Sequence, residues 1–142
     1  MYIELLEQYG AKYIGFKIQT AVTKREICIA EKELNTTFPR ELSELLLETN
    51  GDNYLLLSLN QIVKYNQDFR GLNPNIIKPS LFQFNEYLFI ATNGCGDYYG
   101  YKIKDGTIQS TNIIIFEHEE YKSRIVAKNL AELIEYYYKN QI

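Results

Sequence analysis

The amino-acid sequence predicts an α+β fold, in which helices flank a mixed, mostly antiparallel sheet built from meander hairpins. Apolar residues recur at helical spacing near both ends of the chain, and strand-like segments separated by glycine turns follow Tyr87. No linker, charge block or internal repeat divides the 142 residues, and a chain of this length suits one ordinary domain. We therefore expect a single domain that covers residues 1–142.

Helical patterns begin at the N-terminus. Between Tyr2 and Tyr9 four apolar side chains fall at positions i, i+3, i+4 and i+7, and Gly10 follows them. This spacing predicts a short amphipathic helix. Thr23 and Glu26 have the spacing of a capping box, so a second helix is expected to begin there.

A third helix is expected after Pro39, because proline suits a first helical turn, and Asn50-Gly51 should end it. The apolar run Tyr54–Leu57 is bounded by turn residues and predicts a short buried strand. Leu59–Tyr65 is interpreted as a helical turn. The segment Asn66–Phe84 holds a glycine, two prolines and many amides, which indicate a long irregular connection of the kind that often carries function.

A hairpin is predicted around Asn93–Asp97, which reads Asn-Gly-Cys-Gly-Asp. Tyr87–Thr92 leads into this turn, and Tyr98–Ile103 leaves it with the alternating side chains of a strand. The glycines superficially resemble a phosphate-binding loop, but such loops open a helix, whereas a strand follows here. We therefore interpret them as residues that allow positive φ in a tight turn, with Asp97 bonding turn amides.

The sheet is expected to continue as a meander. Asp105-Gly106 is a preferred two-residue hairpin turn, so Thr107–Gln109 should pair back antiparallel, and Asn112–Phe116 supplies a further β-branched strand. A C-terminal helix is predicted over Leu130–Tyr137, where four apolar side chains again share one helical face.

Composition favours a cytoplasmic protein that binds neither nucleic acid nor membranes. With 15 Lys and Arg against 18 Asp and Glu the net charge is −3, which leaves no basic footprint for nucleic acid and suits a basic partner. No apolar run approaches the roughly 20 residues of a membrane-spanning helix, and carboxylates stand where a secretory signal would be basic. Cys28 and Cys95 are expected to be reduced thiols that pack inside the fold.

No recognisable catalytic motif accompanies these elements. Glu117–Glu120, which reads Glu-His-Glu-Glu, offers metal ligands, but a lone histidine among carboxylates lacks a defined metal spacing, and we interpret the segment as a solvated strand edge. Asp52 is either a loop residue that solvates a turn or, with Asp97 and exposed tyrosines, part of an acidic rim. We expect no cofactor, no metal and no enzymatic activity.

Two segments resemble the SUKH superfamily. Phe38–Leu42 followed by Asn50-Gly51 is similar to the family's LP-x-x-(x)-L…NG segment. Leu88–Tyr99 is similar to a family strand that ends in a (D/N)-G-x-G-D turn and is followed by an aromatic strand. The resemblance covers Thr20 to Tyr138 in element order, and it implies an α+β domain with a mixed, mostly antiparallel sheet and flanking helices.

The resemblance also implies a function. Many bacterial members are immunity proteins that bind and neutralise a cognate toxin, commonly a nuclease, fungal relatives regulate cell-wall synthesis, and the family has no catalytic motif. We therefore expect an immunity protein that occludes a secreted or contact-delivered toxin, with contacts drawn from Asp52, Asp97, Tyr98, Tyr99 and the Asn66–Phe84 segment. A regulatory or scaffold module with a resident partner is the first alternative. A ligand-binding protein or enzyme with a pocket near Glu117 and His118 is the second.

Overall fold

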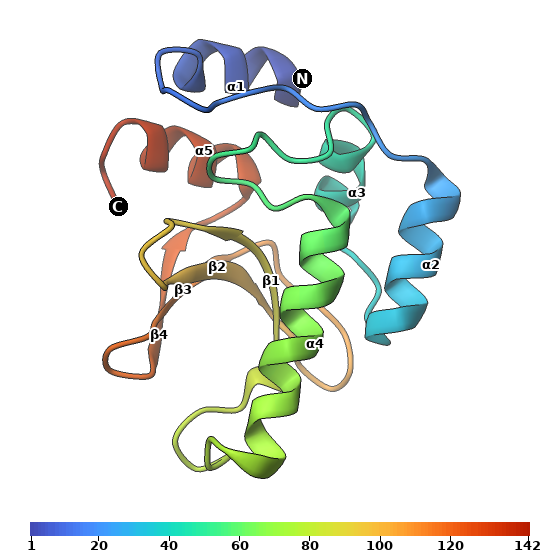
Figure 1. The fold of residues 1–142 in the computed structure, drawn as a ribbon, viewed down its shortest axis with the longest axis vertical. Helices are drawn as coiled ribbons and strands as arrows, with labels where there is room; N and C mark the ends of the chain where they lie inside the picture. Colours follow the sequence, from blue (N-terminus) through green and yellow to red (C-terminus); the bar gives the residue numbers. More distant parts are fainter.

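Four strands form one antiparallel sheet, a meander in the order β1-β2-β3-β4. The computed structural model describes all 142 residues (Figure 1). The elements follow one another as α1 (Tyr2–Gly10), α2 (Lys24–Leu34), α3 (Arg40–Leu46), α4 (Leu59–Asn75), a 3-10 turn (Phe84–Glu86), β1 (Tyr87–Thr92), β2 (Tyr98–Lys102), β3 (Ile113–Glu117), β4 (Lys122–Ala127) and α5 (Leu130–Tyr138). The predicted α+β class and the predicted meander are confirmed. None of the helices combines the length and the apolar character that crossing a membrane requires.

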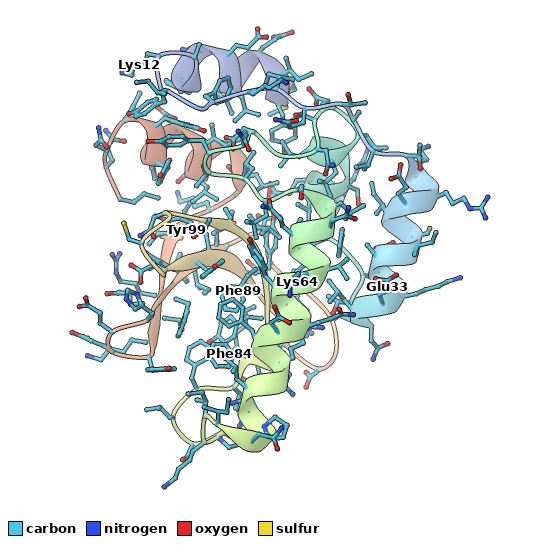
Figure 2. All side chains as sticks on the ribbon, viewed as in Figure 1. Lys12, Glu33, Lys64, Phe84, Phe89 and Tyr99 are labelled. Atoms are coloured by element: carbon cyan, nitrogen blue, oxygen red, sulfur yellow. The ribbon has the colours of Figure 1, made fainter.

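The strands divide their side chains between two cores, because successive residues of a strand point to opposite faces. One face supplies the larger core, which is shared with all five helices and includes Leu88, Ile90, Tyr99, Tyr101, Ile113 and Ile115. The other face supplies a smaller aromatic core of Phe82, Phe84, Tyr87, Phe89, Ile114 and Phe116, against which Phe69 of α4 packs. Figure 2 shows Phe84 and Phe89 beside α4.

Helix α4 is the main departure from the predicted organisation. Asn66–Phe84 was expected to be irregular, but α4 continues through the first half of this segment. Ser58 and Gln61 form a capping box at its start, in which Ser58 N donates to Gln61 Oε1 at 2.9 Å and Gln61 N donates to Ser58 Oγ at 3.3 Å. Pro74 lies one residue before the end of the helix. Because proline has no N–H, only one carbonyl of the helix loses its intrahelical hydrogen bond there.

The outer edge of β1 is closed by α4 and by the segment before it. Asn66 Nδ2 donates to Phe89 O at 2.8 Å, and Phe89 N donates to Asn66 Oδ1 at 2.8 Å. Leu57 N donates to Ile90 O at 3.0 Å. The prediction of a strand over Tyr54–Leu57 is wrong. This segment makes only a single bridge to β1, because the side chain of Asn66 occupies the N–H and C=O of Phe89 that a longer strand would use.

Three smaller differences from the predicted elements are also found. Thr107–Gln109 makes one bridge rather than a strand, and β4 was not predicted because four of its six residues in a row are exposed and show no alternation. Helix α3 ends at Leu46, before Asn50-Gly51. After Leu46 the chain leaves the helix and contacts the segment between α1 and α2, where Gln19 N donates to Thr49 Oγ1 at 2.9 Å.

Candidate partner-binding surface

Two turns meet at one end of the sheet, the β1–β2 turn and the β3–β4 turn. Asp97 Oδ1 accepts from His118 N at 3.0 Å and lies 2.6 Å from His118 Nδ1. Asn93 Nδ2 donates to Asp97 Oδ2 at 3.2 Å. Partial burial opposes the charge of this carboxyl, but the hydrogen bonds from His118 and Asn93 outweigh it and hold the pKa of Asp97 below its ordinary value.

The glycine turn itself has the predicted hairpin geometry. Gly94 and Gly96 have φ of +77° and +97°, and a Cβ at Gly96 would lie 2.9 Å from His118 Nδ1. The close approach of the two turns therefore needs glycine at this position. The prediction that Asp97 bonds turn amides is confirmed only in part, because its carboxylate accepts from the backbone N–H of His118 in the neighbouring turn and from the side chain of Asn93, and not from amides of its own turn.

Both cysteines are free and exposed, so the expectation that they pack inside the fold is wrong. Cys95 lies between the two glycines at the tip of the turn, where its N–H donates to Asn93 Oδ1 at 2.8 Å. Cys28 lies on α2, and its exposed side chain faces away from the core contacts of that helix.

An acidic depression of about 230 Å³ lies between the two turns and is lined by Cys95, Asp97, Glu117, His118, Glu119 and Glu120. Arg124 pairs with Glu117 at 3.0 Å and Lys122 pairs with Glu120 at 2.9 Å. Glu119 is exposed and forms no ion pair. The depression therefore presents negative charge, and no three His, Cys, Asp or Glu side chains are arranged to hold a metal ion.

An aromatic groove of about 340 Å³ adjoins the turns on the α4 side. Its lining residues are Tyr65, Asp68, Phe69, Leu72 and Tyr98. The ring of Tyr98 meets Phe69 edge-on at 4.9 Å and Tyr65 edge-on at 6.1 Å, measured between ring centroids. Asp97 and Tyr98 are consecutive, so they join the groove to the depression. We call the residues that line these two hollows the hairpin surface.

Asp97 and Tyr98 are thus brought together, whereas Asp52 is not, because its side chain is fully buried. Asp52 Oδ1 accepts from the backbone N–H groups of Tyr54, Leu55 and Leu56 at 2.9, 2.8 and 2.8 Å, and Tyr138 donates its hydroxyl to Oδ2. The expectation of an exposed rim residue is wrong, since this carboxylate satisfies amides of a buried loop. Burial raises the pKa of Asp52, although these hydrogen bonds oppose the rise.

Tyr99 is also buried, with 1% of its surface exposed. Its ring meets Tyr137 of α5 edge-on at 6.2 Å, so it belongs to the larger core. The Asn66–Phe84 segment, also predicted to contact a partner, is partly buried and partly at the hairpin surface. Asn66 is buried against β1, while Asp68, Phe69 and Leu72 line the groove.

Sequence reasoning missed the contribution of α4 to the groove. Tyr65, Phe69 and Leu72 stand at i, i+4 and i+7, which is the spacing of one helical face. Gly71 and Pro74 interrupt this pattern and are typical of a loop, so the sequence predicts an irregular connection there.

Comparison with known proteins identifies a family for this chain. The model of the SMI1 / KNR4 family (SUKH-1) matches residues 21–136, which is more than half of the chain. A search of curated proteins found no significant match. The matched residues include the second to fourth helices, all four strands and most of α5. The chain therefore belongs to the SMI1 / KNR4 family (SUKH-1).

Proposed function

We propose that this chain is a cytoplasmic immunity protein that binds a cognate bacterial toxin through the hairpin surface and neutralises it by occlusion. Membership of the SMI1 / KNR4 family (SUKH-1) supports an immunity or regulatory module, and its members are generally non-catalytic. The observation that carries the proposal is the aromatic groove beside the acidic depression. A secreted or contact-delivered nuclease is the first toxin class to test.

The chemistry of the hairpin surface suits a basic protein partner. Tyrosine and phenylalanine give a large contact area at the centre of protein interfaces, and Tyr65 and Tyr98 offer partly exposed rings there. The carboxylates of the depression complement positive charge, which accelerates association and excludes wrong partners. A nuclease that binds the phosphates of nucleic acid through Lys and Arg carries such positive charge.

The same surface is held in place before any partner arrives. The carboxylate of Asp97 ties the two turns together through His118, and Asn93 fixes the tip through Cys95 N. A preorganised surface loses less conformational entropy on binding. The fixed geometry of the β1–β2 and β3–β4 turns therefore supports a role in binding a partner protein.

Co-expression with the product of the gene beside this one, the first candidate for the toxin, tests the proposal. Wild-type protein is expected to protect a bacterial host, and Tyr65→Ala combined with Glu119→Lys is expected to lose protection. Tyr136→Ala combined with Glu4→Lys is the matched control, because it changes a half-buried tyrosine and an exposed glutamate that do not line the hairpin surface. Equal protection by both double variants would contradict the proposed surface, and a neighbouring protein that neither poisons the host nor binds would contradict the proposed function.

A regulatory module with a resident partner is the alternative that the family also supports. Affinity capture from the protein's own cells discriminates between the two. A toxin as the retained partner supports the immunity function, whereas a housekeeping protein retained through Tyr65 and Glu119 supports the regulatory one.

A further inference from the structure

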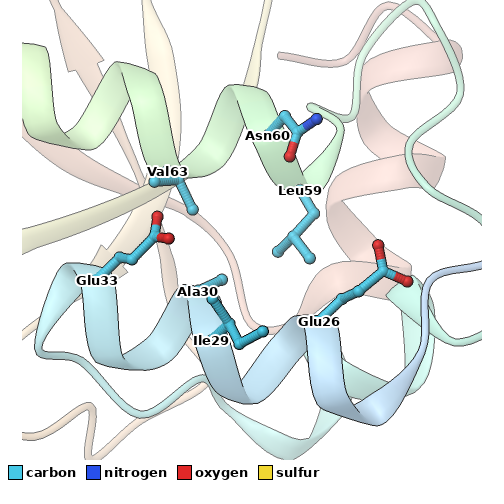
Figure 3. Close-up of a pocket in the computed structure, with 7 residues that line it drawn as sticks. All are labelled: Glu26, Ile29, Ala30, Glu33, Leu59, Asn60 and Val63. Carbon is cyan, nitrogen blue, oxygen red and sulfur yellow. The ribbon is translucent and has the colours of Figure 1, made fainter.

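A notch between α2 and α4 shares no residue with the hairpin surface. The two helices lie side by side and run in the same direction (Figure 1). The notch has a volume of about 130 Å³ and is lined by Glu26, Ile29, Ala30, Glu33, Leu59, Asn60 and Val63 (Figure 3). It is therefore large enough for one or two side chains rather than for a free-standing cofactor.

Most of the lining between the two glutamates is apolar, and Asn60 adds one polar side chain. Ala30 is buried at the floor, and its small side chain leaves space against Leu59 and Val63. Ile29, on the same helix, keeps 47% of its surface exposed. A partner that covers this exposed part of Ile29 gains from removing apolar surface from water.

Two carboxylates flank this apolar centre. Glu26 stands near one end of the notch and Glu33 at the other (Figure 3), and neither forms an ion pair. Glu26 Oε1 accepts from Thr23 N and from Thr23 Oγ1, both at 3.0 Å, so this carboxylate is fixed in place. No basic side chain lines the notch, and the nearby Lys64 is paired with Asp68 at 2.9 Å.

From this arrangement we infer that the notch binds an amphipathic helix of a partner protein, in which two basic residues flank apolar side chains. Glu26 and Glu33 are seven residues apart, which on a helix is about 10 Å along the axis. Basic residues seven apart on a docked helix match this separation, and the residues one turn inside them meet Ile29 and Ala30. Such docking adds a third helix to the α2–α4 pair, in the manner of helix-in-groove recognition.

The probe is an alanine-based helical peptide with two arginines seven positions apart and a leucine one turn inside each. Its titration into the isotope-labelled full-length protein is expected to shift the amide resonances around Ile29 and Val63. A peptide with citrulline in place of arginine keeps the shape and removes the charge, and it should bind more weakly. The Glu26→Gln, Glu33→Gln double variant should weaken binding of the arginine peptide by about two- to tenfold, the range expected for two exposed ion pairs.

Two features keep the experiment decisive. Glutamine also completes a capping box at the third helical position, so Glu26→Gln removes the charge without removing the helix cap. The Glu4→Gln, Glu7→Gln variant is the matched control, because it removes two exposed carboxylates from α1. The inference is overturned if the arginine peptide does not bind, if citrulline binds equally well, or if the control weakens binding as much. It is also overturned if Ile29 proves to be covered by a second copy of this chain in sedimentation experiments.

Discussion

The buried carboxylate of Asp52 offers the strongest test of how the fold is held together. Asp52→Ala leaves two buried amides, one partly buried amide and the Tyr138 hydroxyl without their acceptor. An orphaned buried polar group costs about 1–3 kcal/mol. Because the loop can relax and water can enter, we expect a total loss of about 3–6 kcal/mol, a large part of the roughly 5–15 kcal/mol of a typical domain.

Urea unfolding followed by circular dichroism measures this loss. Asp52→Asn keeps an oxygen for the three amides, so it should stay within about 2 kcal/mol of the wild type. Asp105→Asn changes an exposed carboxylate and should stay within about 0.5 kcal/mol. If Asp52→Ala does not fold, Asp52→Asn and Tyr138→Phe can still be compared. An Asp52→Ala variant within about 1 kcal/mol of the wild type would refute the reasoning.

The pH dependence of the same variants gives an independent check. Burial raises the folded-state pKa of Asp52 above the unfolded value of about 3.9. Over the window between these two pKa values the folded state binds more protons than the unfolded state, so stability falls as the pH rises. The wild type should therefore lose stability relative to Asp52→Asn as the pH rises through that window. A gain in stability of the wild type relative to Asp52→Asn as the pH rises would mean that the hydrogen bonds lower the pKa of Asp52 more than burial raises it.

Three further predictions concern the sheet and its turns. Asn66→Ala leaves Phe89 N and Phe89 O without partners and should destabilise the protein by about 2–4 kcal/mol; unchanged amide exchange at Phe89 would contradict this. Gly96→Ala forces a positive φ on alanine and a contact with His118, so it should cost about 1–3 kcal/mol in thermal unfolding, and an unchanged melting temperature would show that the turn moves freely. The Asp97 carboxyl should titrate below about 3.9 by NMR, and His118→Ala should raise its pKa because the hydrogen bond from the His118 ring is lost, while the backbone N–H of residue 118 still donates to Asp97. Its contribution to stability is complete above the unfolded pKa and is lost as the pH falls through the folded pKa.

The features that the sequence predicts correctly are those determined by short-range chemistry. The capping box of Thr23 and Glu26 is present with both hydrogen bonds, and Asp105-Gly106 adopts positive φ at both residues. The spacing from Tyr2 to Tyr9 also yields the expected helix. Each of these patterns depends only on residues that are close in the sequence.

The errors that concern the candidate site and the edge of the sheet arise where a polar side chain acts over a long sequence distance. Asn66 and Arg70 looked like loop residues, yet they bind backbone carbonyls of β1 from a helix. Asp52 looked like a surface carboxylate, yet its partner Tyr138 is 86 positions away. Polar residues in such roles cannot be distinguished from solvated ones without the fold, and the same applies to the pairing of Asp97 with His118 across two turns.

Hydrogen–deuterium exchange on the complex with the proposed toxin, sought first in the product of the neighbouring gene, tests the central claim most directly. If the hairpin surface occludes the toxin, amide exchange should slow at residues 93–98 and 117–121 of this chain, and the Tyr65→Ala, Glu119→Lys variant should bind more weakly than the Tyr136→Ala, Glu4→Lys control. Protection confined to α1 and α5, with unchanged exchange at both turns, would contradict the claim.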